Sequence, residues 1–242
     1  MTNQTVIITG AACGIGRAIA DRCLKEGYRV LAVDISTAGL ASLAADFPSA
    51  DLSTHLVDVA DGVQVNRFFD SLPVNQEEPS HLINNAGIYL GKNILTYTAD
   101  DIQRVVAVNC LGAVFFTTRF AQELITSDRR GSIINMASVA GQEGSSDAVY
   151  GLSKAALIGF TKSCAMNFAP HIRVNAIAPA LVSTSLLGNV PRERVDDYRH
   201  GELLKDPILP EDVADTVAFL LSEQSRCYTG AVFDINNGHY RR

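Results

Sequence analysis

Two side chains of this sequence have the types and the spacing needed to move a proton at an oxygen atom. Tyr150 and Lys154 are four residues apart in the segment YGLSK, and in a helix such a step places both side chains on one face. A free tyrosine titrates near pH ~10, and a neighbouring ammonium group favours the phenolate and lowers that pKa. A tyrosine tuned in this way can take a proton from an alcohol or return it to a forming alkoxide.

A serine upstream of this pair could complete the site. Ser138 follows the apolar run Ile133–Met136, and its hydroxyl can hydrogen-bond a reacting oxygen and orient it. Taken singly, each residue has a simpler interpretation: a tyrosine on a helix is more often a core residue, and Ser138 can be a plain strand-end hydroxyl. Catalysis is favoured when all of them occur behind a nucleotide-binding loop.

Such a loop lies near the N-terminus. The β-branched run Thr5–Thr9 leads into the segment TGAACGIG, which spans Thr9–Gly16, and a helical pattern begins inside it. Glycines are needed where the backbone turns tightly and approaches a pyrophosphate, and the N-terminus of the following helix offers free N–H groups to the phosphates. A glycine triplet alone can merely close a turn. The position between a strand and a helix favours dinucleotide binding.

The second predicted strand ends at Asp34, eighteen residues beyond Gly16. A carboxylate at this point accepts hydrogen bonds from the ribose hydroxyls of adenosine and repels a 2′-phosphate. No basic residue is placed to offset that repulsion, because Cys13 precedes the middle glycine and Ile35 follows Asp34. The sequence therefore predicts NAD(H) rather than NADP(H), and the positive charge of an oxidised nicotinamide ring would also favour the phenolate of Tyr150.

Together these motifs resemble the classical short-chain dehydrogenases/reductases, over essentially the whole chain and with an overall likeness to 3-oxoacyl-(acyl-carrier-protein) reductases. Thr9–Gly16 matches the family pattern T-G-x-x-x-G-x-G, and Asn84–Gly87 matches N-N-A-G. Pro179–Thr184 matches P-G-x-x-x-T, with Ala180 in place of the glycine. The family's catalytic tetrad falls on the following residues: Asn109, Ser138, Tyr150 and Lys154.

The resemblance also implies roles for residues around the cofactor. Asn109 would hold a water that links Lys154 to bulk solvent, Asp58 and Val59 would contact the adenine ring, and Val182 and Thr184 would bind the carboxamide. The two asparagines of Asn84–Gly87 could instead serve mainly to tie the sheet together. The implied cofactor-binding set is Gly10, Cys13, Gly14, Ile15, Gly16, Asp34, Asp58, Val59, Asn85, Ala86, Gly87, Tyr150, Lys154, Pro179, Val182 and Thr184. No metal site is expected.

This sequence departs from the family pattern at two places. Ala180 gives the loop after Pro179 less backbone freedom than a glycine would. Near the C-terminus, Asn236-Asn237-Gly238 stands where the family often has D-G-G. We expect only local effects from both departures, since neither touches the tetrad.

The elements that must position these residues alternate between short β-branched runs and longer helical patterns. Several runs are continuously apolar, which is typical of parallel strands covered on both faces. The predicted strands are Thr5–Thr9, Tyr28–Asp34, Thr54–Asp58, His81–Asn84, Gly131–Ala137, Arg173–Ala178 and Ala231–Ile235. The predicted helices span 14–26, 37–46, 61–71, 100–126, 148–168 and 211–222. This order predicts one α/β domain over 1–242: a Rossmann-type, doubly wound parallel sheet of about seven strands with helices on both faces.

Composition limits the classes of partner. The formal net charge of −6 repels nucleic acid and anionic membranes, and we expect neither as a partner. No apolar run reaches the ~18 residues that span a bilayer, and the first residues lack the pattern of a secretory signal. The five cysteines are odd in number and widely spread, which argues against a disulfide framework or a zinc site. We expect a cytoplasmic protein.

Substrate recognition should depend on three weakly patterned segments: 183–209, which we interpret as a lid, Ile88–Gly91 and Gly141–Asp147. Basic side chains in the first could attract an anionic substrate, but we favour their being the solvent face of an amphipathic lid helix. They are Arg192, Arg194, Arg199 and His200. Glu143 could instead bind hydroxyl groups, such as those of a sugar or polyol.

The resulting hypothesis is an NAD(H)-dependent oxidoreductase that interconverts a secondary alcohol and a ketone, with Tyr150 as the acid/base and a small alcohol or carbonyl compound as substrate. One alternative is a 3-oxoacyl-(acyl-carrier-protein) reductase, although Asp34 disfavours the NADPH that such reductases usually use. A second alternative is a non-catalytic NAD(H)-sensing protein, which would usually lack part of the tetrad. We also expect a homotetramer assembled through the helices at 100–126 and 148–168.

Overall fold

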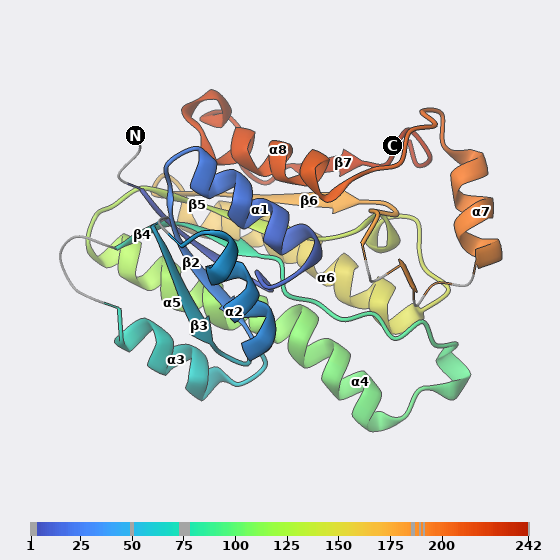
Figure 1. The fold of residues 1–242 in the computed structure, drawn as a ribbon, viewed down its shortest axis with the longest axis horizontal. Helices are drawn as coiled ribbons and strands as arrows, with labels where there is room; N and C mark the ends of the chain where they lie inside the picture. Colours follow the sequence, from blue (N-terminus) through green and yellow to red (C-terminus); the bar gives the residue numbers. More distant parts are fainter. Residues whose placement is uncertain are drawn as a thin grey trace.

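The computed structural model describes residues 4–48, 51–72, 78–184, 187–188, 190 and 192–241. Seven parallel strands form one sheet in the order β3-β2-β1-β4-β5-β6-β7, as Figure 1 shows in part. Their bounds are β1 Thr5–Thr9, β2 Arg29–Asp34, β3 Leu52–Leu56, β4 Pro79–Asn84, β5 Gly131–Met136, β6 Ile172–Pro179 and β7 Val232–Ile235. The α-helices are α1 Gly14–Lys25, α2 Thr37–Asp46, α3 Gly62–Asp70, α4 Ala99–Val106, α5 Gly112–Thr126, α6 Ala148–Phe168, α7 Arg192–Gly201 and α8 Pro210–Leu221. The predicted doubly wound α/β fold is confirmed.

Helices cover both faces of the sheet, which explains the continuously apolar strands. In β1, Val6 and Ile8 pack in the core beneath α1, α2 and α8, whereas Ile7 packs in the core on the other face, against α3, α5 and α6 (Figure 1). β5 alternates in the same way, with Ile133 and Ile134 in opposite cores. Because each strand must be apolar on both sides, the sequence shows a continuous run of apolar residues instead of alternating apolar and polar residues.

The chain begins in the middle of the sheet and reverses its direction of winding once. It moves outward from β1 to β3 and then returns to pair β4 with the other side of β1. In open parallel sheets, the crevice outside the carboxyl ends of the two strands at such a reversal is the usual ligand site. Here those ends carry Gly10 and Asn85, so the topology places the predicted nucleotide loop at the expected position.

The third strand was predicted two residues too late. β3 is an edge strand of the sheet and pairs with β2 from Val30 opposite Leu52 to Asp34 opposite Leu56. Pairing with β2, and not local β propensity, sets its ends. Asp58 therefore lies in the turn after the strand and does not end it.

The predicted helix over 100–126 contains an unpredicted break in its hydrogen-bonding pattern. α4 and α5 are joined by a π-helical turn over Ala107–Leu111, where each N–H bonds one residue further back than in an α-helix. Asn109 lies in this turn and is buried. Turns of this kind are frequent at functional sites because they redirect one side chain within a helix.

Among the described residues, the same helical stretch is also the one helix whose length and composition match a membrane span. Ala99–Thr126 contains an 18-residue window with a mean hydropathy of 1.3, of which 44% is buried inside the protein. Phe116 and Phe120 on this stretch are fully buried against the sheet. Such burial is what a core helix of a folded domain requires, and it explains why the stretch is so apolar.

Candidate active site

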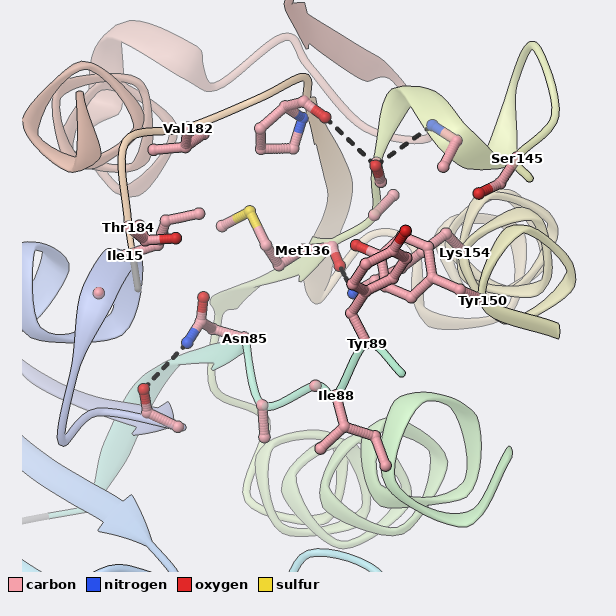
Figure 2. Close-up of a pocket in the computed structure, with 18 of the residues that line it drawn as sticks. Ile15, Asn85, Ile88, Tyr89, Met136, Ser145, Tyr150, Lys154, Val182 and Thr184 are labelled. Carbon is pink, nitrogen blue, oxygen red and sulfur yellow. Dashed lines mark hydrogen bonds between the residues drawn. The ribbon is translucent and has the colours of Figure 1, made fainter. Parts of the chain in front are cut away.

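One cavity of about 880 Å³ lies at the carboxyl ends of the strands, within the range of roughly 300–1,000 Å³ that is usual for small-molecule sites. Figure 2 shows Ile15, Val182 and Thr184 on one side of it and Tyr150 and Lys154 on the other. Every residue of the predicted catalytic and cofactor sets lines this cavity except Gly16 and Asn109. Those two lie directly behind its wall, where each supports a lining segment.

The loop between β1 and α1 has the backbone that its glycines imply. Gly10 and Gly14 have φ angles of +67° and +53°, a region that side chains with a Cβ rarely occupy. A Cβ on Gly16 would lie 2.0 Å from the carbonyl oxygen of Gly10, so helix and turn can approach this closely only with glycine. Cys13 precedes the helix and makes no side-chain cap, which leaves the first N–H groups of α1 available to an anion.

The asparagine pair at the end of β4 does tie the sheet together. Asn85 Nδ2 donates to the carbonyl oxygens of Thr9 and Gly10, both at 3.1 Å, and Thr9 Oγ1 accepts from the N–H groups of Asn85 and Ala86 at 3.0 and 3.1 Å. Asn84 Nδ2 donates to Asn135 Oδ1 in β5 at 2.8 Å. These bonds fix the two strands that flank the crevice, and Asn85 and Ala86 line the cavity at the same time.

The far end of the cavity suits an adenosine group. Asp34 Oδ2 accepts from Ala12 N and Asp34 Oδ1 from Ser36 N, each at 2.9 Å. The carboxylate is thus held at the cavity edge, beside the 68% exposed side chain of Ile35. Asp58 is fixed similarly, since its Oδ1 accepts from Ala60 N at 2.9 Å. Both carboxylates keep free lone pairs with which to accept hydrogen bonds from a ligand.

The catalytic pair lies at the opposite end. Lys154 Nζ is buried, donates to the carbonyl oxygen of Met136 at 2.7 Å and lies 5.7 Å from the centre of the Tyr150 ring. Ser138 Oγ donates to the carbonyl oxygen of Pro179 at 3.3 Å. The Tyr89 ring packs edge-on against Tyr150, with the ring centres 5.0 Å apart (Figure 2). The side chains predicted from the Y-x-x-x-K spacing are therefore brought together on one cavity wall.

Electrostatics at this wall differ from the prediction in one respect. Burial lowers the pKa of Lys154 to about 8. Burial also raises the pKa of Tyr150 to about 12, although its hydrogen bond with Ser138 lowers it. The lowering predicted from Lys154 is therefore not seen in the protein alone: burial dominates, Tyr89 and Asp147 raise the pKa further, and the hydrogen bond with Ser138 is the one opposing contribution.

The Asn109 side chain joins two segments of the cavity wall by hydrogen bonds. Its Oδ1 accepts from Ile88 N at 2.8 Å, and its Nδ2 donates to Ile88 O and to Ser153 Oγ, both at 3.0 Å. A Cβ on Gly87 would lie 3.4 Å from both Asn109 Oδ1 and Lys154 Nζ. The glycine therefore keeps open the space between these two groups, where the water implied by the family resemblance would have to lie.

Sequence reasoning gave no individual role to Asp147, which supports this site, or to Tyr89 and His239, which line the cavity. Asp147 is fully buried and accepts from Tyr150 N at 3.0 Å, from Gly91 N at 3.0 Å and from Tyr97 Oη at 2.6 Å. An aspartate three residues before Tyr150 is a recognisable N-cap for the helix. The bonds to Gly91 and Tyr97 join segments that are distant in sequence, so no local signal could reveal them.

The segment that we interpret as a lid contains the helix α7, Arg192–Gly201. α7 has no buried residue, and Arg192, Arg199 and His200 are exposed and do not line the cavity. Arg194 does line it, together with Asp197 and Tyr198. Residues 185, 186, 189 and 191 of the predicted segment, including Leu186, lie outside the described residues.

The donor set fits a dinucleotide better than a metal ion. Within the described ranges, no group of three or more His, Cys, Asp or Glu side chains is placed to hold a metal. The five cysteines are all free thiols. By contrast, the glycine turn, the open N-terminus of α1 and the fixed carboxylate of Asp34 form the cradle that a pyrophosphate and an adenosine ribose require.

Comparisons with known proteins agree with this geometry. Residues 10–239 match the family model described as enoyl-(acyl-carrier-protein) reductase. The (3R)-3-hydroxyacyl-CoA dehydrogenase of Canis lupus familiaris is 34% identical over 99% of this chain and 97% of its own length. The 3-oxoacyl-[acyl-carrier-protein] reductase of Thermotoga maritima is 33% identical over 98% of both chains. The solved structure of 4-hydroxyisoleucine dehydrogenase complexed with NADH has a TM-score of 0.91 and 30% identity, covering 98% of both chains.

Proposed function

The chain belongs to the classical short-chain dehydrogenase/reductase family, and from that premise we propose that it interconverts a secondary alcohol and a ketone with NAD(H). The observation that carries the proposal is the single cavity that joins the glycine turn after β1 to the Ser138, Tyr150 and Lys154 side chains. An oxidoreductase of this class acting on CH–OH groups needs both ends in one space, because the hydride and the proton leave the same substrate group.

The described residues suit NAD(H) along its whole length. The N-terminus of α1 would hold the pyrophosphate, Asp34 the adenosine ribose, and Val182 and Thr184 the carboxamide. When bound, NAD(H) supplies the hydride exchange with the substrate carbon and, in its oxidised form, a positive charge near Tyr150. The phenolate of Tyr150, which burial disfavours and the Ser138 hydrogen bond favours, would be stabilised further by that charge. The solved relative complexed with NADH supports this choice.

The side chains would divide the proton chemistry among them. Tyr150 would take the hydroxyl proton during oxidation and return it to the oxygen during reduction. Ser138 Oγ would hydrogen-bond the same substrate oxygen and hold it in line with Tyr150. Lys154, fixed by Met136 O at 2.7 Å, would hold the nicotinamide ribose. It would also pass the proton on towards the space beside Asn109.

We propose NAD(H) over NADP(H) because of Asp34. Its carboxylate is anchored by two backbone N–H groups at 2.9 Å, so it cannot easily swing away from an incoming 2′-phosphate. A 3-oxoacyl-(acyl-carrier-protein) reductase remains the second candidate, supported by the identity to relatives of that name. The anchored Asp34 argues against the NADPH that a biosynthetic reductase usually uses.

The test is an assay at the reduced-nicotinamide absorbance band. The chain is offered NAD⁺ or NADP⁺ with secondary alcohols, polyols, hydroxy acids and a 3-hydroxyacyl thioester. Turnover with NAD⁺ on one chemical class supports the proposal. Tight NADH binding without turnover on any class would instead favour a non-catalytic NAD(H)-sensing protein, and turnover of the thioester with NADP⁺ alone would favour the reductase.

We further propose a cytoplasmic homotetramer. Apolar side chains are exposed along the helices that we expect to form the interfaces: Ile102, Leu111, Ile125, Leu152 and Met166. Exposed apolar groups on adjacent helices favour burial between subunits. Sedimentation that shows only a monomer would contradict the assembly, and cell fractionation tests the location.

A further inference from the structure

The substrate end of the cavity contains a buried hydroxyl group that has no partner among the described residues. Tyr198 on α7 lines the cavity, and its Oη is buried without a hydrogen-bond partner among the residues that the structure describes. A buried hydroxyl that makes no hydrogen bond costs roughly 1–3 kcal/mol. Because buried polar groups are normally hydrogen-bonded, an unpaired one that lines a ligand cavity needs an explanation, and a bound ligand would supply it.

The Tyr198 ring is held in place by the C-terminal turn. It stacks on the ring of His239, with the ring centres 3.6 Å apart and the planes inclined by 22°, and His239 lines the same cavity. A Cβ on Gly201 would lie 2.6 Å from His239 Nδ1, so the glycine that ends α7 leaves the room that the histidine ring occupies.

The unusual asparagine of this turn secures the contact. The Asn237 carbonyl oxygen accepts from the N–H groups of Leu203 and Leu204 at 2.8 and 3.1 Å, and its Nδ2 donates to Asp206 O at 2.8 Å. Together these bonds join the C-terminal turn to the segment after the lid helix, and the one from Nδ2 depends on the asparagine side chain. α7 and the C-terminal end lie at the same end of the molecule in Figure 1.

The charges around Tyr198 keep it a neutral hydroxyl. Burial raises the pKa of the Tyr198 hydroxyl, and the carboxylates of Glu143 and Glu202 raise it further. A neutral phenol can both donate and accept a hydrogen bond. Glu143 lines the cavity as well, so an acceptor-only carboxylate stands near a hydroxyl that has no partner.

We propose that Glu143, Tyr198 and His239 form a recognition subsite for a second hydroxyl group of the substrate, so that the substrate is a short polyol or the corresponding hydroxyketone. The inference rests on the proposed function and names its substrate class. A hydroxyl group satisfies this set because it donates to Glu143 while it exchanges a hydrogen bond with Tyr198.

The charged side chains that line this end fit a neutral ligand better than an anion. Arg194 and Asp197 both line the cavity and offset each other, which leaves the negative charge of Glu143. The other three basic side chains of the lid helix face solvent. A substrate carboxylate would be repelled by Glu143, and an unsubstituted acyl chain would leave Tyr198 Oη without a partner.

The experiment compares matched substrates on the full-length enzyme with NAD⁺. The polyols 2,3-butanediol, erythritol and sorbitol are set against 2-butanol, 2-hexanol, 3-hydroxybutyrate and a 3-hydroxybutyryl thioester. We expect kcat/KM for the best polyol to exceed that of the mono-alcohols at least about tenfold, the selectivity that a site built around a hydroxyl can provide. Tyr198→Phe should lower the polyol to mono-alcohol ratio about tenfold without changing the NADH dissociation constant.

The matched control is Tyr228→Phe, which removes a hydroxyl from a tyrosine outside the cavity whose ring packs on Phe233. It should keep the wild-type ratio. Preference for the thioester, the hydroxy acid or the mono-alcohols, or a ratio that Tyr198→Phe leaves unchanged, overturns the subsite while the oxidoreductase stands. Absence of turnover on every class overturns the proposed function and the subsite with it.

Discussion

The two ends of the cavity are built in different ways. The cofactor end is held by hydrogen bonds from the Asn85 side chain to the backbone of Thr9 and Gly10, and a Cβ at Gly10 or Gly16 would clash with backbone atoms. The substrate end is formed where the exposed helix α7 meets the C-terminal turn through one ring stack between Tyr198 and His239. The first end therefore depends mainly on backbone geometry and glycine, and the second depends on the choice of individual side chains.

The largest effect should come from the boundary between the two ends. We predict that Tyr150→Phe lowers turnover about a thousandfold, because the loss of a positioned acid/base typically costs 10²–10⁴-fold, while NADH binding persists. Nicotinamide absorbance measures turnover and NADH fluorescence measures binding. As a comparison, Tyr89→Phe keeps the ring that packs on Tyr150 and should cost less than about tenfold. Near-normal turnover of the Tyr150 variant would refute its acid/base role.

A pair of glycine substitutions should separate the two ends directly. We predict that Gly16→Ala destabilises the fold by about 3 kcal/mol and weakens NADH binding, since the new Cβ would lie 2.0 Å from Gly10 O, a backbone atom. Gly201→Ala should change the unfolding free energy by less than about 1 kcal/mol, because alanine stabilises the helix relative to glycine while the displaced His239 ring loses packing. The same displacement should raise KM for the substrate.

Urea unfolding measures the stability changes, NADH titration measures cofactor binding, and steady-state kinetics measure KM. Gly159→Ala is the control, because an added Cβ there meets nothing within 4 Å, and it should leave stability equal or higher by about 0.5–1 kcal/mol. If Gly16→Ala were as stable as the wild type, or if Gly201→Ala weakened NADH binding instead of raising KM, the contrast between the two ends would be lost.

The same contrast explains what could be read from the sequence. The glycine turn, Asp34 and the Tyr150–Lys154 pair were predicted because each depends on local spacing and on the backbone. The π-helical turn over Ala107–Leu111 was not predicted, because its apolar pattern continues that of α4 and α5. The bonds of Asp147 to Gly91 and Tyr97, and the stack of Tyr198 on His239, join segments that only the tertiary fold brings together.

The preference for NAD(H) or NADP(H) tests whether a side chain, that of Asp34, also determines a property of the cofactor end. We predict that Asp34→Ser combined with Ile35→Arg shifts the ratio of NADPH to NADH affinity at least tenfold, and up to about a hundredfold. The change removes one negative charge beside the 2′-position and adds a positive one. The double variant should also lose some stability, because serine cannot replace both carboxylate bonds to Ala12 N and Ser36 N. An unchanged ratio would show that Asp34 is not the selector.

The smallest effect should come from the link between the lid and the C-terminal turn. Asn237 has a φ angle of +50°, which asparagine and glycine tolerate and alanine does not. We predict that Asn237→Ala costs about 1–2 kcal/mol of unfolding free energy and raises substrate KM a few-fold, because both the backbone and the side-chain bond to Asp206 O are disturbed. Asn237→Gly keeps the backbone conformation and loses only that bond, so it should cost less stability but raise KM similarly.

Thermal unfolding and steady-state kinetics on the two variants separate the effect of backbone strain from the effect of the lost side-chain bond. A KM that rises with Asn237→Ala alone would mean that strain matters and the anchor does not, whereas a shared rise means that the turn positions Tyr198 through its hold on the segment after α7.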